Sequence, residues 1–343
     1  MPRHFYHPKT VQALWWDLYH FIRFSALGAT ATLPLLGAGS VEARLSLRRA
    51  GGLLAVATAF HTFAYVSNDV CDLDLDRTQP RRRRYPLVRG AVTPEAALGV
   101  ALACVPLAFG LHAALVAPDA HARARLDARI SLALAFGAMA AYNRWGKTCP
   151  FPPLTDLVQA LGWAALLRYG ALATGQGPTA LTRLLLAYEV LLILMVNGVH
   201  GALRDLDNDA ARGARTTALL LGARVEDGRL RLSPALLVYA LTLQAGLLAL
   251  PLSYLANPSG DRAGARGVVA LAGATLLTLA RMARGPQGDD GPGMAHLVLL
   301  LSIPVALVAP RLAPLPRLAL LAAHLLPLLP NGATYAALRW ALR

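Results

Sequence analysis

The chain has 343 residues, of which 56% are hydrophobic and 15% are charged, and its mean hydropathy is +0.46. Soluble globular proteins carry about 25% charged residues, so this chain has too few charges to cover a surface that faces water. Its apolar content excludes a disordered chain, and three cysteines exclude a disulfide scaffold. The net charge is +14, but the arginines form short clusters between long apolar runs, which is typical of a membrane protein. We therefore expect a polytopic membrane protein whose partner is the lipid bilayer and not a nucleic acid.

Apolar runs long enough to cross a bilayer recur along the chain. A crossing helix needs about 20 mainly apolar residues, and such runs lie near 14–38, 50–67, 93–117, 128–143, 154–174, 181–203, 234–256, 264–282 and 292–310. A further stretch, 313–329, is either a tenth crossing or a re-entrant end. The runs show no alternation of period two, which favours helices over a barrel. We predict an all-α fold of about nine transmembrane helices in a single domain over residues 1–343, without a cleavable signal peptide.

The basic residues predict how the chain is oriented in the membrane. With the N-terminus in the cytoplasm, the cytoplasmic loops hold 18 basic residues and the opposite loops hold 8. This bias agrees with the positive-inside rule. The loops after the second, fourth and sixth crossings then share the cytoplasmic face, which is that of the plasma membrane if the protein is bacterial.

The second predicted crossing ends in a cluster of acidic residues. Asn68, Asp72 and Asp76 recur every four residues and so share one stripe of a helix, with Asp69 beside the stripe and Asp74 pointing away. Three oxygen-bearing side chains on one stripe repel each other unless a cation lies among them. Oxygen ligands that leave room for water suit Mg²⁺, whose coordination is usually completed by substrate phosphates.

The sixth predicted crossing ends in a second cluster, in which Asp205 and Asp209 are also four residues apart. Arginines follow both clusters, at 81–84 after the first and at Arg215 after the second. Carboxylates that hold metal ions, together with arginines that neutralise phosphate, would suit a diphosphate. One such cluster alone also fits a solvated charge run or a head-group contact, whereas two on the same face predict a functional site.

Both clusters resemble known motifs. Asn68-Asp69-x-x-Asp72-x-x-x-Asp76 resembles the first aspartate-rich motif of the UbiA superfamily of intramembrane prenyltransferases. The second motif of that superfamily is similar to Asp205-x-x-x-Asp209-x-x-x-Gly213-x-Arg215-Thr216-Thr217. The resemblance in order and spacing covers residues 15–220, whereas 234–330 carry no chemistry of their own and would complete the helical ring. We call the two segments motif 1 (residues 68–76) and motif 2 (residues 205–217).

The resemblance implies nine transmembrane helices around a central cavity that opens laterally to lipid. It also implies that the motifs bind two or more Mg²⁺ ions and the diphosphate of a polyprenyl donor. The implied metal ligands are Asn68, Asp69, Asp72, Asp76, Asp205 and Asp209. The implied catalytic set is Asp72, Asp76, Asp205, Asp209 and Tyr142, and the implied diphosphate contacts are Asn68, Lys147, Arg81, Arg84 and Arg215.

Two segments depart from the pattern of the superfamily. Tyr142 and Lys147 resemble its tyrosine–lysine element, with Lys147 on the diphosphate and Tyr142 near the reacting carbon, but four residues separate them where the pattern has three. Lys147 also fits an ordinary positive-inside residue. Where many relatives read Arg-Pro-Leu-Pro-x-Gly after the first motif, this chain has Tyr85 in place of the arginine. Which arginine of the run reaches phosphate, and which substrate binds, therefore stays open.

Other side chains within the crossings have weaker interpretations. Arg23 is placed either to meet a carboxylate or phenol acceptor or to snorkel to the interface. We expect His61 and His200 to be buried or cavity-lining groups and not metal ligands, and Arg168 to be able to pair with Glu189. The aromatic residues that could face a carbocation, or simply pack, are Tyr65, Tyr142, Trp163, Tyr169 and Tyr188.

The function predicted from these motifs is transfer of a prenyl group from an allylic diphosphate to a small aromatic acceptor. The nearest rival is a terpene cyclase of the same superfamily, which uses the same aspartates but no external acceptor. A transporter is a third class, but it predicts inverted repeats and broken helices at the midplane. The acidic residues here cluster at helix ends on one face, which argues against a transporter.

Overall fold

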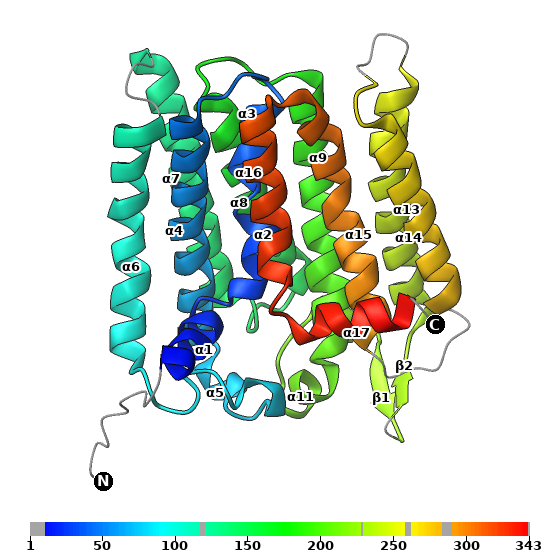
Figure 1. The fold of residues 1–343 in the computed structure, drawn as a ribbon. Helices are drawn as coiled ribbons and strands as arrows, with labels where there is room; N and C mark the ends of the chain where they lie inside the picture. The colour runs from blue at the N-terminus through cyan, green and yellow to red at the C-terminus, as the bar shows by residue number, and fades with distance from the viewer. Residues whose placement is uncertain (1–10, 117–120, 228, 258–261, 283–289, 342–343) are drawn as a thin grey trace.

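The computed structural model describes residues 11–116, 121–227, 229–257, 262–282 and 290–341. Long helices stand side by side and short elements gather at one end of the bundle (Figure 1). A two-stranded antiparallel hairpin, in which Arg224 pairs with Arg231, is the only sheet in the described residues. The predicted all-α fold is therefore confirmed.

The helices of the first half begin with α1 (Val11–Phe21), η1 (Phe24–Ala26), α2 (Leu27–Thr30), α3 (Leu33–Gly39), α4 (Leu47–Cys71) and α5 (Leu73–Asp76). They continue with η2 (Pro80–Arg82), α6 (Pro94–Leu111), the π-helix η3 (His112–Val116), α7 (Ala122–Trp145) and α8 (Pro152–Leu172).

The second half contains α9 (Ala180–Met195), the π-helix η4 (Val196–Gly201), α10 (Ala202–Arg204), α11 (Leu206–Ala211), α12 (Thr217–Leu220), β1 (Arg224–Glu226) and β2 (Arg229–Arg231). It ends with α13 (Pro234–Ala256), α14 (Ala265–Met282), α15 (Asp290–Val308), η5 (Ala309–Arg311), α16 (Pro314–Leu325), η6 (Leu326–Leu328) and α17 (Gly332–Ala341).

Helix starts follow from local sequence. Thr93 and Ser233 cap α6 and α13 by accepting a backbone N–H three residues on, and each is followed by a proline at the first helical position. A hydroxyl cap satisfies a backbone donor that the helix leaves free, and proline has no such donor to satisfy. These caps fix where two of the apolar runs become helices.

Six helical segments are long and apolar enough to cross a membrane, and a bent pair at the N-terminus makes a seventh. The six are Leu47–Cys71, Pro94–Val116, Ala180–Arg204, Pro234–Ala256, Ala265–Met282 and Gly291–Arg311. The predicted count of nine is not confirmed in the described residues. The stretch 314–328 forms an apolar helix shorter than these six.

The structure has fewer clearly apolar spans than the nine predicted because of α7 and α8. Both helices are long enough to cross a membrane, but they carry more polar residues. The first turns of α7 hold Arg123, Arg125 and Asp127. Helix α8 contains Asp156 and Arg168, yet its Trp163 and many neighbours are buried inside the bundle. A helix surrounded by protein is shielded from lipid, so it does not need a uniformly apolar surface.

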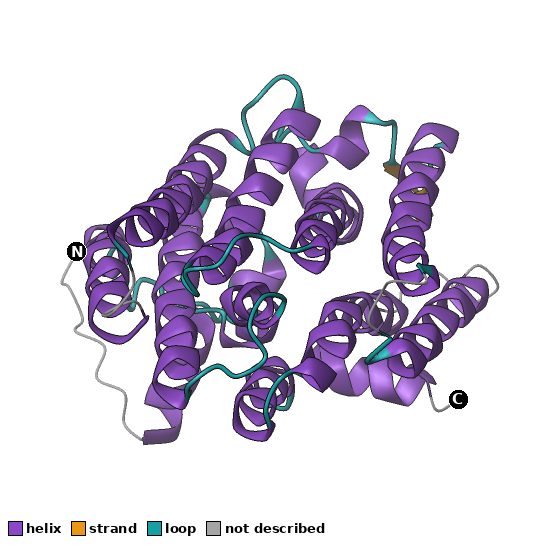
Figure 2. Cartoon of the chain, turned by 90° about the horizontal axis from the view of Figure 1, so that it is seen from above, coloured by secondary structure: helices purple, strands orange, loops and turns teal. Residues whose placement is uncertain are grey.

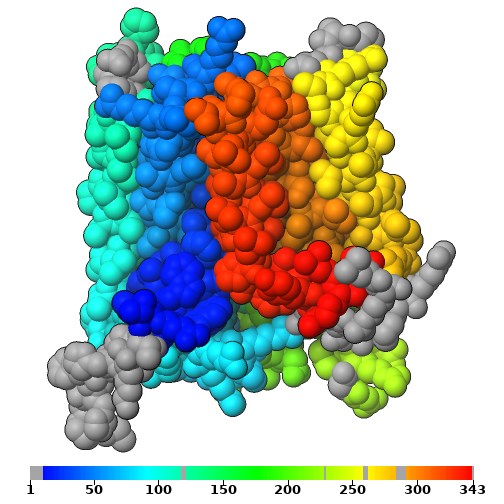
Figure 3. All heavy atoms as spheres, viewed as in Figure 1, coloured from blue at the N-terminus to red at the C-terminus, as the bar shows by residue number. Residues whose placement is uncertain are grey.

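The first predicted crossing, 14–38, is broken. Arg23 has φ +47° and ψ +52°, the left-handed conformation that ends a helix, and the axes on either side differ by 55°. As a result α1 lies across the end of the bundle beside the motif 1 loop, on the same level as α17 (Figures 1 and 3). Only α2 and α3 continue the direction of the crossing.

The outer helices present apolar side chains on their exposed faces, as contact with lipid requires. These exposed residues include Leu98, Leu102, Leu107, Leu134, Val238, Leu241, Val269, Leu276 and Leu277. Seen from above, the helices lie side by side, joined by loops across the end of the bundle (Figure 2). The chain is therefore an integral, multi-pass membrane protein. The central cavity and the cytoplasmic placement of the motif loops stay predictions.

Candidate active site

Motif 1 continues the helical path of α4 through a break. Helix α4 ends at Cys71, and Asp72 (φ −94°, ψ 8°) joins it to α5. The backbone N–H of Asp72 donates to the carbonyl of Asn68 (2.9 Å), and that of Asp76 donates to the carbonyl of Asp72 (2.8 Å). The spacing of four residues is therefore kept, and Asn68 Nδ2 donates to Asp72 Oδ2 at 3.1 Å. By contrast, the Asp74 side chain is 98% exposed and pairs with Arg77 outside the site.

Motif 2 has the same construction. Asp205 (φ −103°, ψ 6°) joins α10 to α11, and the backbone N–H of Asp209 donates to its carbonyl at 2.9 Å. Leu206 and Ala218 belong to a small apolar cluster of their own, with Ala202, Ala223 and Leu236. This cluster anchors the segment independently of the main core. Both motifs thus place an aspartate between a short helix and a long helical segment, which is α4 in motif 1 and Ala180–Arg204 in motif 2.

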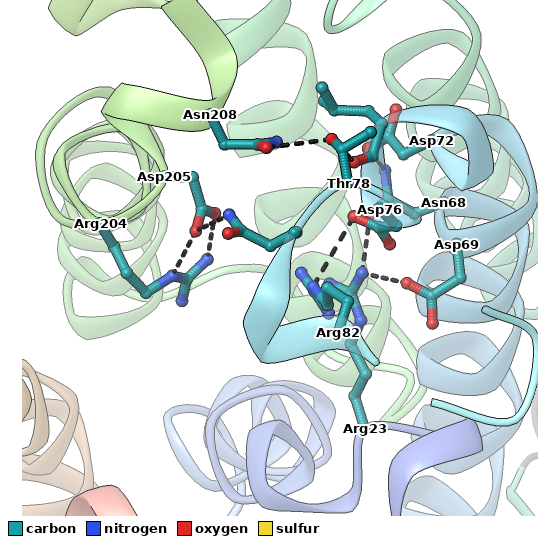
Figure 4. A network of polar contacts seen from close by, with 12 residues as sticks. Arg23, Asn68, Asp69, Asp72, Asp76, Thr78, Arg82, Arg204, Asp205 and Asn208 are labelled. Carbon is teal, nitrogen blue, oxygen red and sulfur yellow. Dashed lines mark hydrogen bonds and ion pairs between the residues drawn. The ribbon is translucent and has the colours of Figure 1, made fainter. Parts of the chain in front are cut away.

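The segment that follows motif 1 bridges the two motifs. Thr78 Oγ1 donates to Asn208 Oδ1 at 3.0 Å, and Gln79 Nε2 donates to Asp205 Oδ1 at 3.1 Å. Figure 4 shows the labelled Thr78 and Asn208 facing each other across the site. Residues more than 120 positions apart in the chain are therefore held in one polar network.

Cationic side chains point at the acidic residues of both motifs (Figure 4). Arg82 Nε lies 3.7 Å from Asp76 Oδ1. Arg204 binds Asp205 through two contacts, Nε to Oδ1 at 3.2 Å and a terminal nitrogen to Oδ2 at 2.8 Å. Such charge-assisted hydrogen bonds are among the stronger ones in proteins.

Two further cations reach the motifs from more distant segments. Lys147 Nζ donates to Asp209 Oδ2 at 2.8 Å, and Asp209 is only 1% exposed. Arg23 forms an ion pair with Asp69, and its guanidinium carbon lies 5.2 Å from the centre of the Tyr65 ring. Arg23 is thus bound to motif 1, whereas the sequence left open an acceptor contact or snorkelling. Lys147 forms an ion pair with motif 2. This contact is more specific than the loop position that the positive-inside rule alone would explain.

Of the arginine run 81–84, the structure brings Arg82 to a motif carboxylate. Its guanidinium carbon also lies 4.7 Å from the centre of the Tyr85 ring, which stacks on His20 of α1. The predicted phosphate contacts Arg81 and Arg84 are exposed, and the charge of Arg84 acts on His20. The Arg215 backbone N–H donates to the Lys147 carbonyl at 3.0 Å, which places Arg215 beside the tyrosine–lysine element.

The pKa values of aspartates in the two motifs are shifted in different directions. Burial raises the pKa of Asp72 to about 6, against the opposing charge of Lys147. Burial likewise raises the pKa values of Asp76 and Asp209. Burial also acts to raise the pKa of Asp205, but the hydrogen bonds and charge of Arg204 outweigh it and hold that pKa below its ordinary value. Buried carboxylates whose charged form is disfavoured gain from a nearby cation.

The donor set fits Mg²⁺ in its chemistry, since it consists of carboxylate oxygens with an amide oxygen beside them. Asp76 Oδ2 is buried and has no hydrogen-bond partner, so one oxygen is open to a ligand. Within the described ranges, however, no three acidic, histidine or cysteine side chains converge closely enough to hold an ion as they stand. Gln79, Arg82 and Lys147 instead bind the carboxylates that a metal would use.

The predicted aromatic residues fall into two groups. Tyr169 shares a hydrogen bond with His112 (3.2 Å), and Tyr188 donates to the Leu300 carbonyl (2.8 Å), so both have structural partners in the core. Trp163 is also buried, among phenylalanines. Tyr142 is partly buried, and its ring lies against Gly146, one residue before Lys147. Of the aromatic residues predicted from the sequence, Tyr142 therefore lies beside the connection that carries Lys147.

The two histidines predicted to be buried or cavity-lining within the crossings have internal partners. His61 binds the Thr30 hydroxyl through Nδ1 (2.6 Å) and the Ile22 carbonyl through Nε2 (2.7 Å), as expected of a buried histidine. His200 Nε2 lies 3.0 Å from His296 Nδ1. Glu189 is buried, but the described chain has no ion pair between it and Arg168.

Sequence reasoning missed several residues of the site. Thr78, Gln79 and Asp156 had no signal of spacing, because their partners lie far away in the chain. Thr217 belongs to motif 2, but the motif did not predict its contact with Asp156. Asp156 could have been singled out as an acidic residue two turns or less into an apolar helix.

The sequence profile of the UbiA prenyltransferase family matches residues 28–300, well over half of the chain. Two curated relatives are each 29% identical to part of it. The 4-hydroxybenzoate octaprenyltransferase of Alkalilimnicola ehrlichii aligns over 157 residues, which are 46% of this chain and 49% of the relative. The digeranylgeranylglyceryl phosphate synthase of Thermococcus kodakarensis aligns over 200 residues, 54% of this chain and 65% of the relative.

The chain thus spans between about half and just under two thirds of the length of these curated relatives. Solved structures match over more of it. An apo UbiA homolog from Aeropyrum pernix has a TM-score of 0.60 at 22% identity, covering 85% of this chain and 96% of that one. A UbiA homolog from Archaeoglobus fulgidus bound to DMAPP and Mg²⁺ has a TM-score of 0.56 at 17% identity, covering 85% and 99%. These likenesses show a shared helical membrane fold.

Proposed function

The chain belongs to the UbiA prenyltransferase family, and from this premise we propose that it is a Mg²⁺-dependent intramembrane prenyltransferase. It ionises an allylic isoprenoid diphosphate and transfers the prenyl group to a small aromatic acceptor. The observation that carries the proposal is the network in which Gln79 joins motif 1 to Asp205 while Lys147 binds Asp209. The A. fulgidus homolog bound to DMAPP and Mg²⁺ and the relative named for 4-hydroxybenzoate support it.

Each motif supplies a different part of the diphosphate site. Asp72 and Asp76 of motif 1 and Asp205 and Asp209 of motif 2 would hold two or more Mg²⁺ ions, with Asn68 and Asp69 beside them. Bound Mg²⁺ supplies positive charge that stabilises the departing diphosphate. Asp76 Oδ2, which is buried without a partner, is the oxygen most ready to act as a ligand.

Cationic side chains neutralise the rest of the leaving group. Lys147 Nζ and the Arg82 guanidinium now bind Asp209 and Asp76. Bound substrate draws both toward phosphate oxygens, and Arg215, Arg81 and Arg84 extend the positive surface. Losing one contact of this kind typically lowers a rate by about 10²–10³.

The carbocation left by ionisation needs apolar walls and an aromatic face. Tyr142 lies on α7 near Lys147 and would provide the aromatic face, because Tyr169 and Tyr188 already have hydrogen-bond partners in the core. The acceptor then attacks the cation and loses a proton. The motif loops lie on the cytoplasmic side of the membrane, as the bias in basic residues favours.

One observation favours a second candidate, a terpene cyclase without an external acceptor. Arg23, for which the sequence left open contact with a carboxylate or phenol acceptor or snorkelling to the interface, forms an ion pair with Asp69 and lies over Tyr65. Because Arg23 is already paired with Asp69, it is less able to bind a carboxylate acceptor. In the cyclase, the distal double bond of the substrate attacks the cation.

A product assay separates the two functions. Purified protein in detergent with Mg²⁺ is given C10, C15 or C20 allylic diphosphates, each with and without 4-hydroxybenzoate or homogentisate. A product that forms only with an arene, and that Asp72→Ala abolishes, is the result expected of the transferase. A hydrocarbon or terpene alcohol formed without the arene, and lost in the same variant, would establish the cyclase instead.

A further inference from the structure

Three contacts tie the α7–α8 connection and the start of α8 to motif 2. Lys147 Nζ donates to Asp209 Oδ2 at 2.8 Å, and the Arg215 backbone N–H donates to the Lys147 carbonyl at 3.0 Å. The third contact lies further along both segments, where Thr217 Oγ1 donates to Asp156 Oδ2 at 2.5 Å. Two of the three involve Lys147 directly, and the third is a side-chain pair that no step of the proposed reaction uses.

The third contact is the most enclosed of the three. Thr217 is 1% exposed and Asp156 is 8% exposed. A buried carboxylate is costly unless hydrogen bonds satisfy it, so the Thr217 hydroxyl has a strong thermodynamic reason to stay in place. The pair therefore forms a fixed point between α8 and the first residue of α12.

Lys147 gains from such a fixed point because its own segment is a turn and not part of a regular helix or strand. It lies in the short connection between α7 and α8, on a long side chain with several rotatable bonds. The chain between Asp209 and Arg215 also turns sharply, at Gly213 (φ +67°), before it meets Lys147. The hydrogen bond between Asp156 and Thr217 fixes both segments further along the chain. It thereby keeps the backbone of Lys147 beside that of Arg215.

We propose that Asp156 and Thr217 are a positioning pair, which sets Lys147 and Arg215 at the distance from Asp209 that diphosphate binding requires. The inference rests on the proposed function, because it gives Lys147 a role toward the diphosphate. Neither member of the pair touches the diphosphate; both act through Lys147.

The test measures binding of inorganic pyrophosphate with Mg²⁺ to the full chain in detergent by calorimetry. Thr217→Val removes the hydroxyl while keeping the shape, and it should weaken binding about tenfold, the worth of one hydrogen bond to a charged group. Thr217→Ser keeps the hydroxyl and should bind like the unaltered protein. Thr148→Val is the matched control, because Thr148 is an exposed threonine of the same connection.

A double-mutant cycle with Lys147→Met shows whether the pair acts through Lys147. We expect Lys147→Met to weaken binding strongly and Thr217→Val to add less than about twofold on that background, since coupled residues are not additive. An unchanged tenfold effect of Thr217→Val on that background would overturn the inference. So would normal binding by Thr217→Val while Lys147→Met is impaired. Normal binding by Lys147→Met would instead contradict the proposed diphosphate site.

Asp156→Asn serves as a second variant if Thr217→Val does not fold. The amide oxygen still accepts from Thr217 but carries no charge, so positioning is preserved and binding should fall by less than about threefold. A loss of tenfold or more in Asp156→Asn, with a melting temperature equal to that of the unaltered protein, would show that charge and not position matters, and would overturn the inference.

Discussion

At the scale of single residues, the two motifs depend on a side chain that belongs to neither. Gln79 Nε2 donates to Asp205 Oδ1, the same oxygen that accepts from Arg204 Nε. A neutral amide can orient a carboxylate without cancelling its charge, whereas a second arginine there would compete with a metal ion. Gln79 thus holds motif 2 against motif 1 without adding a second positive charge to Asp205.

We predict that Gln79→Ala lowers the rate of diphosphate release about three- to tenfold, in line with the loss of one hydrogen bond. The effect should appear as a higher Mg²⁺ concentration for half-maximal rate, because Asp205 loses its orientation. Gln176→Ala, in an exposed loop, is the control. Equal Mg²⁺ dependence in Gln79→Ala and the control would contradict this role.

Spacing in the sequence predicted the residues within each motif but not their partners. The repeat of four at Asn68, Asp72 and Asp76 is local, and the backbone hydrogen bonds of the structure follow it. The contact of Gln79 with Asp205 joins residues 126 positions apart, and that of Thr217 with Asp156 joins residues 61 apart. Such pairs depend on how helices pack, which no short pattern encodes. The roles assigned to the motif residues stay predictions.

At the scale of elements, α3 and α8 approach closely because each presents a glycine to the other. A Cβ atom on Gly170 would lie 1.9 Å from the Pro34 carbonyl oxygen, and one on Gly37 would lie 2.0 Å from that of Leu167. Small residues at helix contacts are a general device of membrane proteins, since packing replaces the hydrophobic effect there. This contact fixes α8, and with it Asp156, against the broken first crossing.

Gly170→Ala is expected to lower stability by about 1–3 kcal/mol, because backbone atoms must move apart to admit the methyl group. Thermal unfolding in detergent measures this as a lower melting temperature. Gly137→Ala on α7 is the matched control, since nothing lies within 4 Å of its Cβ position. Equal melting temperatures for the two variants would show that the α3–α8 contact is looser than described.

The length of the apolar runs predicted most of the membrane helices well, but it failed where a single residue breaks a run. The expected crossings near 50–67 and 234–256 match α4 and α13 closely. The run 14–38 is divided by Arg23, whose left-handed backbone conformation a hydropathy count does not detect. Arg23 adopts it where its guanidinium binds Asp69 of motif 1, a partner that lies outside the run itself.

At the scale of the whole molecule, the chain gathers its polar chemistry at one end of a helical bundle. The motif segments α5 and α11 lie at the same end as α1 and α17 (Figure 1). The sequence predicted this shared face from the order of crossings alone. It overestimated the number of clearly apolar spans, because α7 and α8 carry polar residues that the surrounding helices shield.

Sided labelling tests the orientation of the bundle. In a chain whose Cys71, Cys104 and Cys149 are replaced by serine, Arg83→Cys lies directly after η2, near motif 1, and Arg44→Cys lies just before α4, at the end of that helix opposite to motif 1. A membrane-impermeant maleimide should label Arg83→Cys only in inside-out vesicles and Arg44→Cys only in right-side-out vesicles, because basic loops stay in the cytoplasm. The reverse pattern would contradict the cytoplasmic placement.

The most direct measurement of the central claim is the release of inorganic pyrophosphate from an allylic diphosphate by purified protein with Mg²⁺. We predict that Asp72→Asn and Asp209→Asn each lower the rate by about 10²–10³. Asp74→Asn and Asp207→Asn, which neutralise exposed aspartates of the same two segments, should keep the full rate. Equal rates in all four variants, or no release by the unaltered protein, would contradict the account of the two motifs as a diphosphate site.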